Sequence, residues 1–176
     1  MSGAAGLIRE IDLAKEIASL RSVLNLSFAT IAEEFGLIPE NSRSNAAFST
    51  EADILDSQRR DGLRFYGLYV EGRLVGCYAL AFKGGDESPR DASSGKISYL
   101  ERLCVLPEQR HAGLGRNLVA DAARRARELG ASRMRIGLID DNFRLKEWYL
   151  SLGFVSEGAE RFPHLPFLVR YMELML

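Results

Sequence analysis

Cysteine and histidine are scarce in this chain, which has only two of each among its 176 residues. Cys77 and Cys104 lie far apart in the sequence and lack the close spacing of zinc-binding motifs. A small secreted protein held together by disulfides would carry more cysteines, so this composition favours a reducing compartment. We therefore expect a cytoplasmic protein with no bound metal.

Long apolar runs and a strong charge of one sign are missing as well. Leu7 and Ile8 are followed at once by Arg9 and Glu10, so the apolar core of a signal peptide does not develop. No stretch approaches the length of a membrane-spanning helix. The formal net charge of -1 gives no reason to expect nucleic acid or an anionic membrane as a partner.

What the chain does contain is typical of a folded globular domain. Hydrophobic residues make up 47% and charged residues 27% of the sequence, which predicts a packed core rather than disorder. The length suits one domain covering residues 1–176. The polar stretch from Gly84 to Gly95 predicts a mobile surface loop, which is too short to separate two domains.

The spacing of apolar residues predicts a strand, two helices, three strands, a helix, a strand, a helix and two strands. The first helix is expected from its capping residue Asp12 to Gly36, and an interruption at residues 25–27 is left open. The predicted strands cover residues 7–11, 64–70, 73–82, 96–105, 133–139 and two segments within 154–176, and the later helices cover 50–60, 108–130 and 142–153. This order indicates an α/β (α+β) fold with a mixed, mostly antiparallel central sheet of about six or seven strands flanked by about four helices.

Turn and cap residues support these boundaries. Glu71-Gly72 is a tight hairpin signal between two strands. Thr50 can cap the second helix, and Gly62 can end it. The third helix carries an apolar stripe that comprises Leu114, Leu118, Ala122, Ala126 and Leu129.

The sharpest motif is a loop in which Gly113 and Gly115 lie at the start of the third helix. Glycine lets a ligand approach the main chain closely, and the free N–H groups and dipole of a helix start attract phosphate. Arg110 and Arg116 add positive charge on either side, and from Glu108 to Lys146 nine Lys and Arg residues outnumber five Asp and Glu. The pattern indicates an anionic ligand. The solvated face of a helix accounts better for three of these arginines, which are Arg124, Arg125 and Arg127.

Several phosphate-binding classes compete for such a loop. A nucleotide triphosphatase would need Gly-Lys-Ser/Thr, whereas Gly115 is followed by Arg116 and Asn117. A dinucleotide-binding fold would need Gly-x-Gly-x-x-Gly in its first strand–helix unit. Here the spacing is Arg-x-x-Gly-x-Gly after a third or fourth strand. The remaining possibility is a pyrophosphate that belongs to another kind of ligand.

This segment closely resembles the GNAT superfamily of acetyltransferases. The family signature is Gln/Arg-x-x-Gly-x-Gly/Ala after a long strand, and Arg110 to Gly115 match it, with Val105-x-Pro107 before and Leu118 after. The order of predicted elements agrees over nearly the whole chain, although the N-terminal third matches only in pattern.

A second family feature lies downstream, at Asn142, Tyr149 and Gly153-Phe154. One departure from the family is Leu145, where a small alanine is usual, and this bears on packing more than on chemistry. Two separate motifs at the family's separation make the resemblance specific.

The resemblance implies a GNAT-like fold and acetyl-CoA as the acyl donor. The donor's pyrophosphate would lie on the backbone N–H groups of seven residues, which are Arg110, His111, Ala112, Gly113, Leu114, Gly115 and Arg116. Its pantetheine arm would pair like an extra strand with Leu103, Cys104 and Val105, where the family splays its fourth and fifth strands apart. Asn142 and Tyr149 would complete the donor site, and a backbone N–H near Val105 would stabilise the oxyanion.

Tyr149 suits the proton transfer to the departing thiolate. A tyrosine hydroxyl has a reference pKa of about 10 and a cysteine-type thiol about 8.5, so donation to the sulfur is feasible. The alternative is that Tyr149 is one more core aromatic residue beside Trp148. The family motif around it favours the catalytic role.

Glu101 is the candidate base. Strand alternation places Tyr99, Glu101 and Leu103 on one face of the strand. A carboxylate within so apolar a strand is costly unless it has a function or a partner. A glutamate pKa of about 4.3 matches an ammonium near 10.4 poorly, so relay through water or a raised pKa is expected. A structural ion pair explains Glu101 equally well.

The resulting prediction is an enzyme that moves an acetyl group from acetyl-CoA to a primary amine, by direct attack of the amine. The acceptor is a small-molecule amine or a peptide, and the family leaves room for a homodimer. A non-catalytic acyl-CoA-binding or sensing module is the alternative, and it would need the loop but not Tyr149. By analogy with the fold, four residues wall the acceptor site: Phe28, Phe35, Asn45 and Phe48.

Three further residues receive no catalytic role. His111 is expected to be exposed, and His164 is expected in a turn between prolines. Cys104 is expected to be a buried thiol rather than a nucleophile, because no histidine is placed to activate it.

Overall fold

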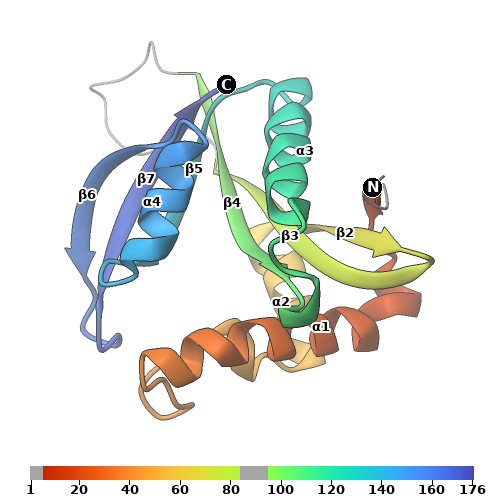
Figure 1. Ribbon diagram of the computed structural model, residues 1–176, viewed down its shortest axis with the longest axis horizontal. Coiled ribbons are helices and arrows are strands. Elements are labelled where there is room, and N and C mark those ends of the chain that lie inside the picture. The colour runs from red at the N-terminus through yellow and green to blue at the C-terminus, as the bar shows by residue number, and fades with distance from the viewer. Residues whose placement is uncertain (1–5, 84–94) are drawn as a thin grey trace. The chain divides into compact units, whose positions relative to one another are not determined.

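The computed structural model describes residues 6–83 and 95–176. Seven strands form one mixed sheet whose hydrogen-bonded order is β1-β2-β3-β4-β5-β7-β6, with four α-helices (Figure 1). The fold class predicted from the sequence is thereby confirmed. The elements are β1 (Leu7–Glu10), α1 (Leu13–Glu34), η1 (Ala46–Phe48), α2 (Glu51–Asp61), β2 (Arg64–Val70), β3 (Arg73–Lys83), β4 (Lys96–Val105), η2 (Pro107–Gln109), α3 (Leu114–Glu128), β5 (Ala131–Ile139), α4 (Phe143–Ser151), β6 (Val155–Arg161) and β7 (Leu168–Met175).

The strand pairings make the sheet mixed. β1 pairs antiparallel with β2, and β7 pairs antiparallel with both β5 and β6. β4 and β5 pair in parallel, and their register runs from Lys96 opposite Ala131 to Tyr99 opposite Arg135. The end of β4 that carries Leu103–Val105 therefore lies beyond this paired stretch.

The described residues fall into two compact units. The first contains the residues up to Ala79 and the segment Arg102–Asp121, and the second contains the described part of Leu80–Glu101 and the segment Ala122–Leu176. Strands β3 and β4 and helix α3 each run through both units. The assignment of residues 1–176 to a single domain stays a prediction.

Helix α1 begins where the sequence predicts. The Asp12 side chain accepts a hydrogen bond from the Ala14 N–H at 3.1 Å, and the Glu16 carboxylate accepts from the Asp12 N–H at 3.2 Å. The interruption left open at residues 25–27 does not occur. Instead, the Asn25 side chain donates to the backbone carbonyls of Ala46 and Ser49, at 2.9 and 3.1 Å. A polar residue in mid-helix thus ties the following loop to α1.

Helix α2 and the β2–β3 hairpin also follow their local signals. Thr50 and Asp53 form a capping box, in which the Thr50 hydroxyl accepts from the Asp53 N–H and the Asp53 carboxylate accepts from the Thr50 N–H. Gly62 ends α2 with a φ of 65°. Glu71 and Gly72 have φ values of 50° and 78°, as a tight hairpin with two left-handed residues requires.

In the second unit, one face of the sheet forms the core. Met134, Ile136 and Leu138 of β5 are buried, whereas the alternating residues Arg133 and Arg135 are half-buried. Figure 1 shows α4 lying in front of β5 and β7. This alternation is the period-two burial of a sheet packed on one side.

Four members of the predicted α3 stripe are buried, but Leu129 is 39% exposed. Its assignment to the stripe is wrong, because α3 ends at Glu128 and the chain then turns at Gly130, whose φ is 84°. The loop predicted from Gly84 to Gly95 lies outside the described residues, apart from Gly95 itself.

None of the helices in the described part of the chain combines the length and apolar character needed to cross a membrane.

Candidate functional site

The loop between β4 and α3 turns through two left-handed residues. His111 has a φ of 66° and Gly113 a φ of 79°, and both are exposed. A Cβ added at Gly113 would meet nothing within 4 Å, so space is available there although the backbone strains any L side chain. The loop thus presents its main chain, not side chains, at the start of α3.

The backbone N–H groups of residues 111–116 find no acceptor within the described residues. Hydrogen bonds resume on either side, where the Arg110 N–H donates to the Pro107 carbonyl at 3.3 Å and the Asn117 N–H to the Gly113 carbonyl at 3.2 Å. The residue before Leu114 is glycine, which has no side chain to cap the helix. Six consecutive donors are therefore available in the loop and the first turn at the positive end of a helix, a setting suited to a pyrophosphate.

The guanidinium of Arg110 is committed to protein acceptors. Its Nε donates to the Val105 carbonyl at 3.1 Å, Nη1 to the Thr30 hydroxyl at 3.1 Å and Nη2 to the Ser27 carbonyl at 2.8 Å. The side chain thereby joins α1 to the end of β4, within the first unit. A direct contact between Arg110 and a phosphate stays a prediction that this geometry does not favour.

The remaining loop residues differ in exposure. Ala112 and Arg116 are exposed, Gly115 is half-buried, and Leu114 is buried at 6% exposure. Arg116 makes no ion pair or hydrogen bond with another described residue, so its charge is available to an anion on the first turn of α3. Leu114 anchors the loop by its side chain and offers a ligand only its N–H group.

Strand β4 carries an irregularity just before the predicted pantetheine-binding residues. Arg102 has a φ of 53°, a left-handed conformation that is uncommon outside glycine. Such a residue reorients the strand that follows, so the alternation placing Glu101 and Leu103 on one face cannot be carried across it. Leu103 is half-buried, and Cys104 and Val105 are buried.

Glu101 is exposed. The argument that its carboxylate bears a burial cost is therefore wrong, because a carboxylate in contact with water keeps its hydration. Glu101 also has interactions with neighbouring groups. Its role as the base stays a prediction that rests on its place in β4.

Tyr149 is both a core aromatic residue and a candidate acid. It is 6% exposed, and its ring lies edge-on to Trp148 and Phe154, with centroids 4.8 and 5.1 Å away. Burial raises the pKa of the Tyr149 hydroxyl far above its usual value of 10. The hydroxyl thus keeps its proton throughout the physiological range and can act as a donor.

Asn142 caps the start of α4, where the sequence predicts that a helix begins. It is buried, and its side-chain oxygen caps α4 by accepting from the Leu145 N–H at 3.1 Å. Nearby, the Asp140 carboxylate accepts from Arg170 at 2.8 Å and from Lys146 at 3.1 Å. These two cations lower the pKa of Asp140, Arg170 more than Lys146. The contact of Asn142 with the donor stays a prediction.

Residues expected at the acceptor site lie in and after α1. Phe28, Phe35 and Phe48 are half-buried, and the Asn45 side chain accepts from the Ala47 N–H at 2.9 Å to cap η1. His164 lies in a turn, as predicted, and is exposed. Within residues 6–83 and 95–176, no group of three or more His, Cys, Asp or Glu side chains is placed to hold a metal ion.

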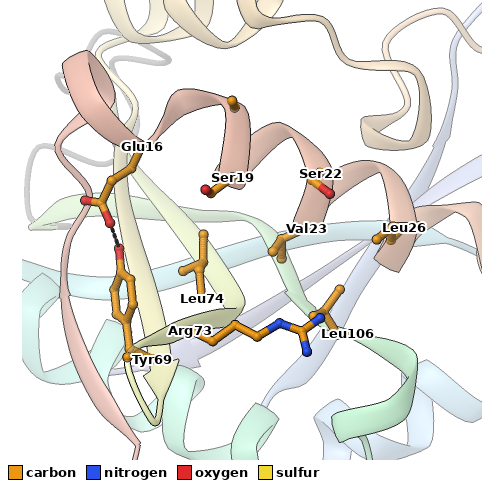
Figure 2. A pocket seen from close by; sticks show the side chains of 11 residues that line it. Glu16, Ser19, Ser22, Val23, Leu26, Tyr69, Arg73, Leu74 and Leu106 are labelled. Carbon is orange, nitrogen blue, oxygen red and sulfur yellow. Dashed lines mark hydrogen bonds between the residues drawn. The ribbon is translucent and has the colours of Figure 1, made fainter.

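Sequence reasoning missed a hollow of about 490 Å³ between α1 and the β2–β3 hairpin (Figure 2). At one end of it, the Glu16 carboxylate accepts from the Tyr69 hydroxyl at 2.7 Å and pairs with Arg9 at 2.8 Å. The hydrogen bond from Arg9, with a smaller one from Tyr69, lowers the pKa of Glu16 to about 2. None of the predicted donor-binding residues lines this hollow.

A pair of thiols was missed as well. Cys77 and Cys104 are 27 positions apart, and their spacing carries no motif, yet their sulfurs lie 3.5 Å from each other. Only the pairing of β3 with β4 brings them together, and that pairing cannot be deduced from cysteine spacing.

Comparison with known proteins places this geometry in a family context. The profile of the acetyltransferase (GNAT) family matches residues 28–154. A ribosomal-protein-alanine N-acetyltransferase from Brucella melitensis is 22% identical with a TM-score of 0.68, over 97% of this chain and 99% of that one. The PaiA N-acetyltransferase of Thermoplasma acidophilum, solved with coenzyme A, is 21% identical with a TM-score of 0.66, over 98% and 99%. An acetyltransferase from Thermus thermophilus is 17% identical with a TM-score of 0.71, over the whole of both chains. At these identities the structural likeness shows the fold.

Proposed function

Because the chain belongs to the acetyltransferase (GNAT) family, we propose that it transfers the acetyl group of acetyl-CoA to a primary amine, by direct attack of that amine on the thioester. Dependence on acetyl-CoA and acyl transfer follow from the family. The proposal adds the acceptor class, which is a small-molecule amine or a peptide, and the residues that carry the reaction.

The observation that carries the proposal is the row of N–H groups at residues 111–116, for which the described part of the chain supplies no acceptor. Two phosphates bring several anionic oxygens to one place, and oriented backbone donors bind them without the entropy loss of ordering long side chains. Arg116 adds an exposed positive charge. Arg110 supports the site indirectly, because it joins the Val105 carbonyl, just before the loop, to α1.

The pantetheine arm carries amide groups and can pair with an exposed strand edge. We assign it to Leu103–Val105, because β4 continues to Val105 beyond its register with β5. Strand-like pairing would place the thioester along β4. A backbone N–H near Val105 would then donate to the carbonyl oxygen as negative charge develops on it.

In the transfer step, the amine nitrogen forms a bond to the thioester carbon while the oxygen takes up charge. Collapse of this intermediate breaks the carbon–sulfur bond, and the CoA thiolate leaves with the bonding electrons. Tyr149 donates its proton to that sulfur, and Glu101 takes the proton lost by the amine, through water. The protein mainly orients the two reactants, which alone removes much of the barrier.

The raised pKa of Tyr149 is compatible with this role. Burial weakens the hydroxyl as an acid. The same apolar surroundings would also disfavour the CoA thiolate and raise the pKa of the thiol, so the proton transfer stays feasible although tyrosine is the weaker acid. The tyrosinate is afterwards restored to its neutral form by a proton that originates from the amine.

The test is a thiol-release assay with acetyl-CoA and a panel of amines, paired with calorimetric titration of acetyl-CoA. The panel includes a polyamine, free amino acids, an aminoglycoside and a peptide with N-terminal alanine, the last because one structural neighbour is named for that acceptor. We expect saturable thiol release with at least one amine. Tight acetyl-CoA binding without turnover on any amine would overturn the enzymatic role and favour an acyl-CoA sensor.

A further inference from the structure

Two buried thiols face each other across neighbouring strands of the first unit. Cys77 on β3 and Cys104 on β4 are both free cysteines, 0% and 9% exposed, with their Sγ atoms 3.5 Å apart. A disulfide bond measures about 2.05 Å, so the sulfurs need to close by about 1.5 Å. Rotation of the two side chains and a small shift of the strands can supply such a movement.

The strands are close enough for this bond. A Cβ added at Gly76 would lie 2.7 Å from the Cys104 carbonyl oxygen, so the β3 backbone reaches β4 closely beside Cys77. Neighbouring strands run about 4.8 Å apart, inside the range of about 4.4–6.8 Å that disulfides span between Cα atoms. The separation of paired strands is therefore compatible with a disulfide between Cys77 and Cys104.

The two thiols are not equivalent. The hydrogen bond with Cys77, aided by the charge of Arg110, lowers the pKa of the Cys104 thiol despite its burial. The same bond and complete burial raise the pKa of the Cys77 thiol. Cys104 is therefore the sulfur that reaches the nucleophilic thiolate form more readily.

We propose that Cys77 and Cys104 form a modification site, an intramolecular disulfide made by oxidants of the peroxide class and reversed by dithiols, which closes the acetyl-CoA site. The regulatory part rests on the proposed function, because Cys104 lies in the segment Leu103–Val105 assigned to the pantetheine arm.

The chemistry balances with hydrogen peroxide as the oxidant. The Cys104 thiolate attacks one peroxide oxygen, so a sulfur–oxygen bond forms, the oxygen–oxygen bond breaks, and the departing hydroxide takes the thiol proton as water. Cys77 sulfur then attacks Cys104 sulfur, and the hydroxyl leaves with the Cys77 proton as a second water. Two electrons pass from the thiol pair to the peroxide.

Closing the bond would disturb the donor site from within. Pulling Cys104 toward β3 displaces the strand between Leu103 and Val105, and the Val105 carbonyl is also the acceptor for Arg110 before the 111–116 loop. We expect acetyl-CoA affinity to fall at least about tenfold on oxidation. By linkage, bound acetyl-CoA must oppose disulfide formation to the same extent.

The experiment treats the full chain with hydrogen peroxide and follows two readouts. Intact mass and a non-reducing peptide map report loss of two hydrogen atoms and a Cys77–Cys104 linked peptide. Calorimetry reports acetyl-CoA affinity before oxidation, after it, and after dithiothreitol. Cys77→Ser is the control, since it keeps Cys104, should bind acetyl-CoA normally before oxidation, and should give no linked peptide after peroxide. Cys77→Ala serves the same purpose if a buried hydroxyl destabilises the fold.

The outcomes separate the claims. A linked peptide, loss of affinity and recovery with dithiothreitol support the proposal. Absence of the linked peptide overturns it, and a linked peptide with unchanged affinity overturns its regulatory part. If the reduced protein fails to bind acetyl-CoA while the disulfide still forms, the modification site stands and the proposed function fails.

Discussion

Helix α3 starts differently from helices α1, α2 and α4. Each of those three begins with a polar residue whose side chain accepts a hydrogen bond from a helix N–H, namely Asp12, Thr50 and Asn142. Helix α3 begins after Gly113, and its first donors are left without acceptors among the described residues. A capped start stabilises its helix by about 1 kcal/mol, whereas an open start forgoes that stability and keeps its donors available.

A capped helix start and an uncapped helix start therefore serve different purposes. At the closed starts the sequence itself satisfies the helix, so changes there should alter the stability of the protein. At the open start a ligand must satisfy the donors, so changes there should alter binding.

The largest effect is expected from Gly113→Glu. A carboxylate at the open start would occupy the donors and repel pyrophosphate, so acetyl-CoA affinity should fall more than about a hundredfold, or about 3 kcal/mol. The matched control is Gly130→Glu, at the other end of α3. Its φ of 84° is close to the 79° of Gly113, and an added Cβ meets nothing within 4 Å at either site. Calorimetry measures the acetyl-CoA affinity of both variants, and thermal unfolding measures the stability that each loses through backbone strain. Equal losses of affinity would contradict the assignment of the donor to this loop.

Tyr149→Phe separates donor binding from chemistry. Removing a positioned general acid typically slows a reaction by about 10²–10⁴-fold, and we expect kcat to fall by roughly a hundredfold. The KM for acetyl-CoA should change little, because the open start of α3 is untouched. Steady-state kinetics with saturating amine measures both constants, and an unchanged kcat removes Tyr149 from the mechanism.

Arg110 and Arg116 should respond oppositely, although both flank the open start. Arg110→Lys loses hydrogen bonds to Val105, Ser27 and Thr30 that a lysine cannot replace, so stability should fall by about 1.5–3 kcal/mol. Arg116→Gln removes an exposed charge, so acetyl-CoA affinity should fall a few-fold with little change in stability. Denaturant unfolding and calorimetry measure the two effects. An Arg110→Lys variant of normal stability would show that the Arg110 clamp, its hydrogen bonds to Val105, Ser27 and Thr30, does not stabilise the fold.

Much of this comparison could be predicted from sequence. Asp12, Thr50 and Asn142 were identified as helix starts, because capping depends on residues within one turn of each other. The Gly113 loop was identified for the same reason. The Arg110 clamp was not, since its acceptors Ser27 and Thr30 lie about eighty positions away in the chain.

The errors have the same physical origin. Glu101 looked buried because its neighbours in β4 are apolar, but exposure depends on what packs against the strand. The left-handed Arg102 breaks an alternation that period counting assumes. Likewise, the contact between Cys77 and Cys104 depends on strand pairing, which local patterns do not encode.

Replacing the Glu16 carboxylate at the start of α1 should lower the free energy of unfolding in a pH-dependent way. Hydrogen bonds from Arg9, and to a smaller extent from Tyr69 and the Asp12 N–H, lower the pKa of the Glu16 carboxylate from 4.5 to about 2. Its contribution is therefore present above the unfolded-state pKa and is lost as the pH falls from about 4.5 toward 2. Unfolding of the wild type and Glu16→Gln should differ most near neutral pH and converge in acid. A difference independent of pH would contradict the ionic origin.

The smallest effect is expected at the start of α4. Asn142→Ala should lower the free energy of unfolding by about 1 kcal/mol, and Asn142→Asp should restore most of it, because aspartate also caps well. Chemical denaturation measures the change. If the alanine variant instead lost acetyl-CoA affinity at unchanged stability, Asn142 would belong with the open start as a donor-binding residue.

The central claim is that the main-chain donors of residues 111–116 bind the acyl donor. Nitrogen-15 correlation spectra recorded during titration with acetyl-CoA observe these N–H groups directly. The account predicts that the amide signals from His111 to Arg116 shift most, while those of Ala14 and Asp53 at the closed starts of α1 and α2 stay in place. Saturable binding that leaves the signals of residues 111–116 unmoved would contradict it.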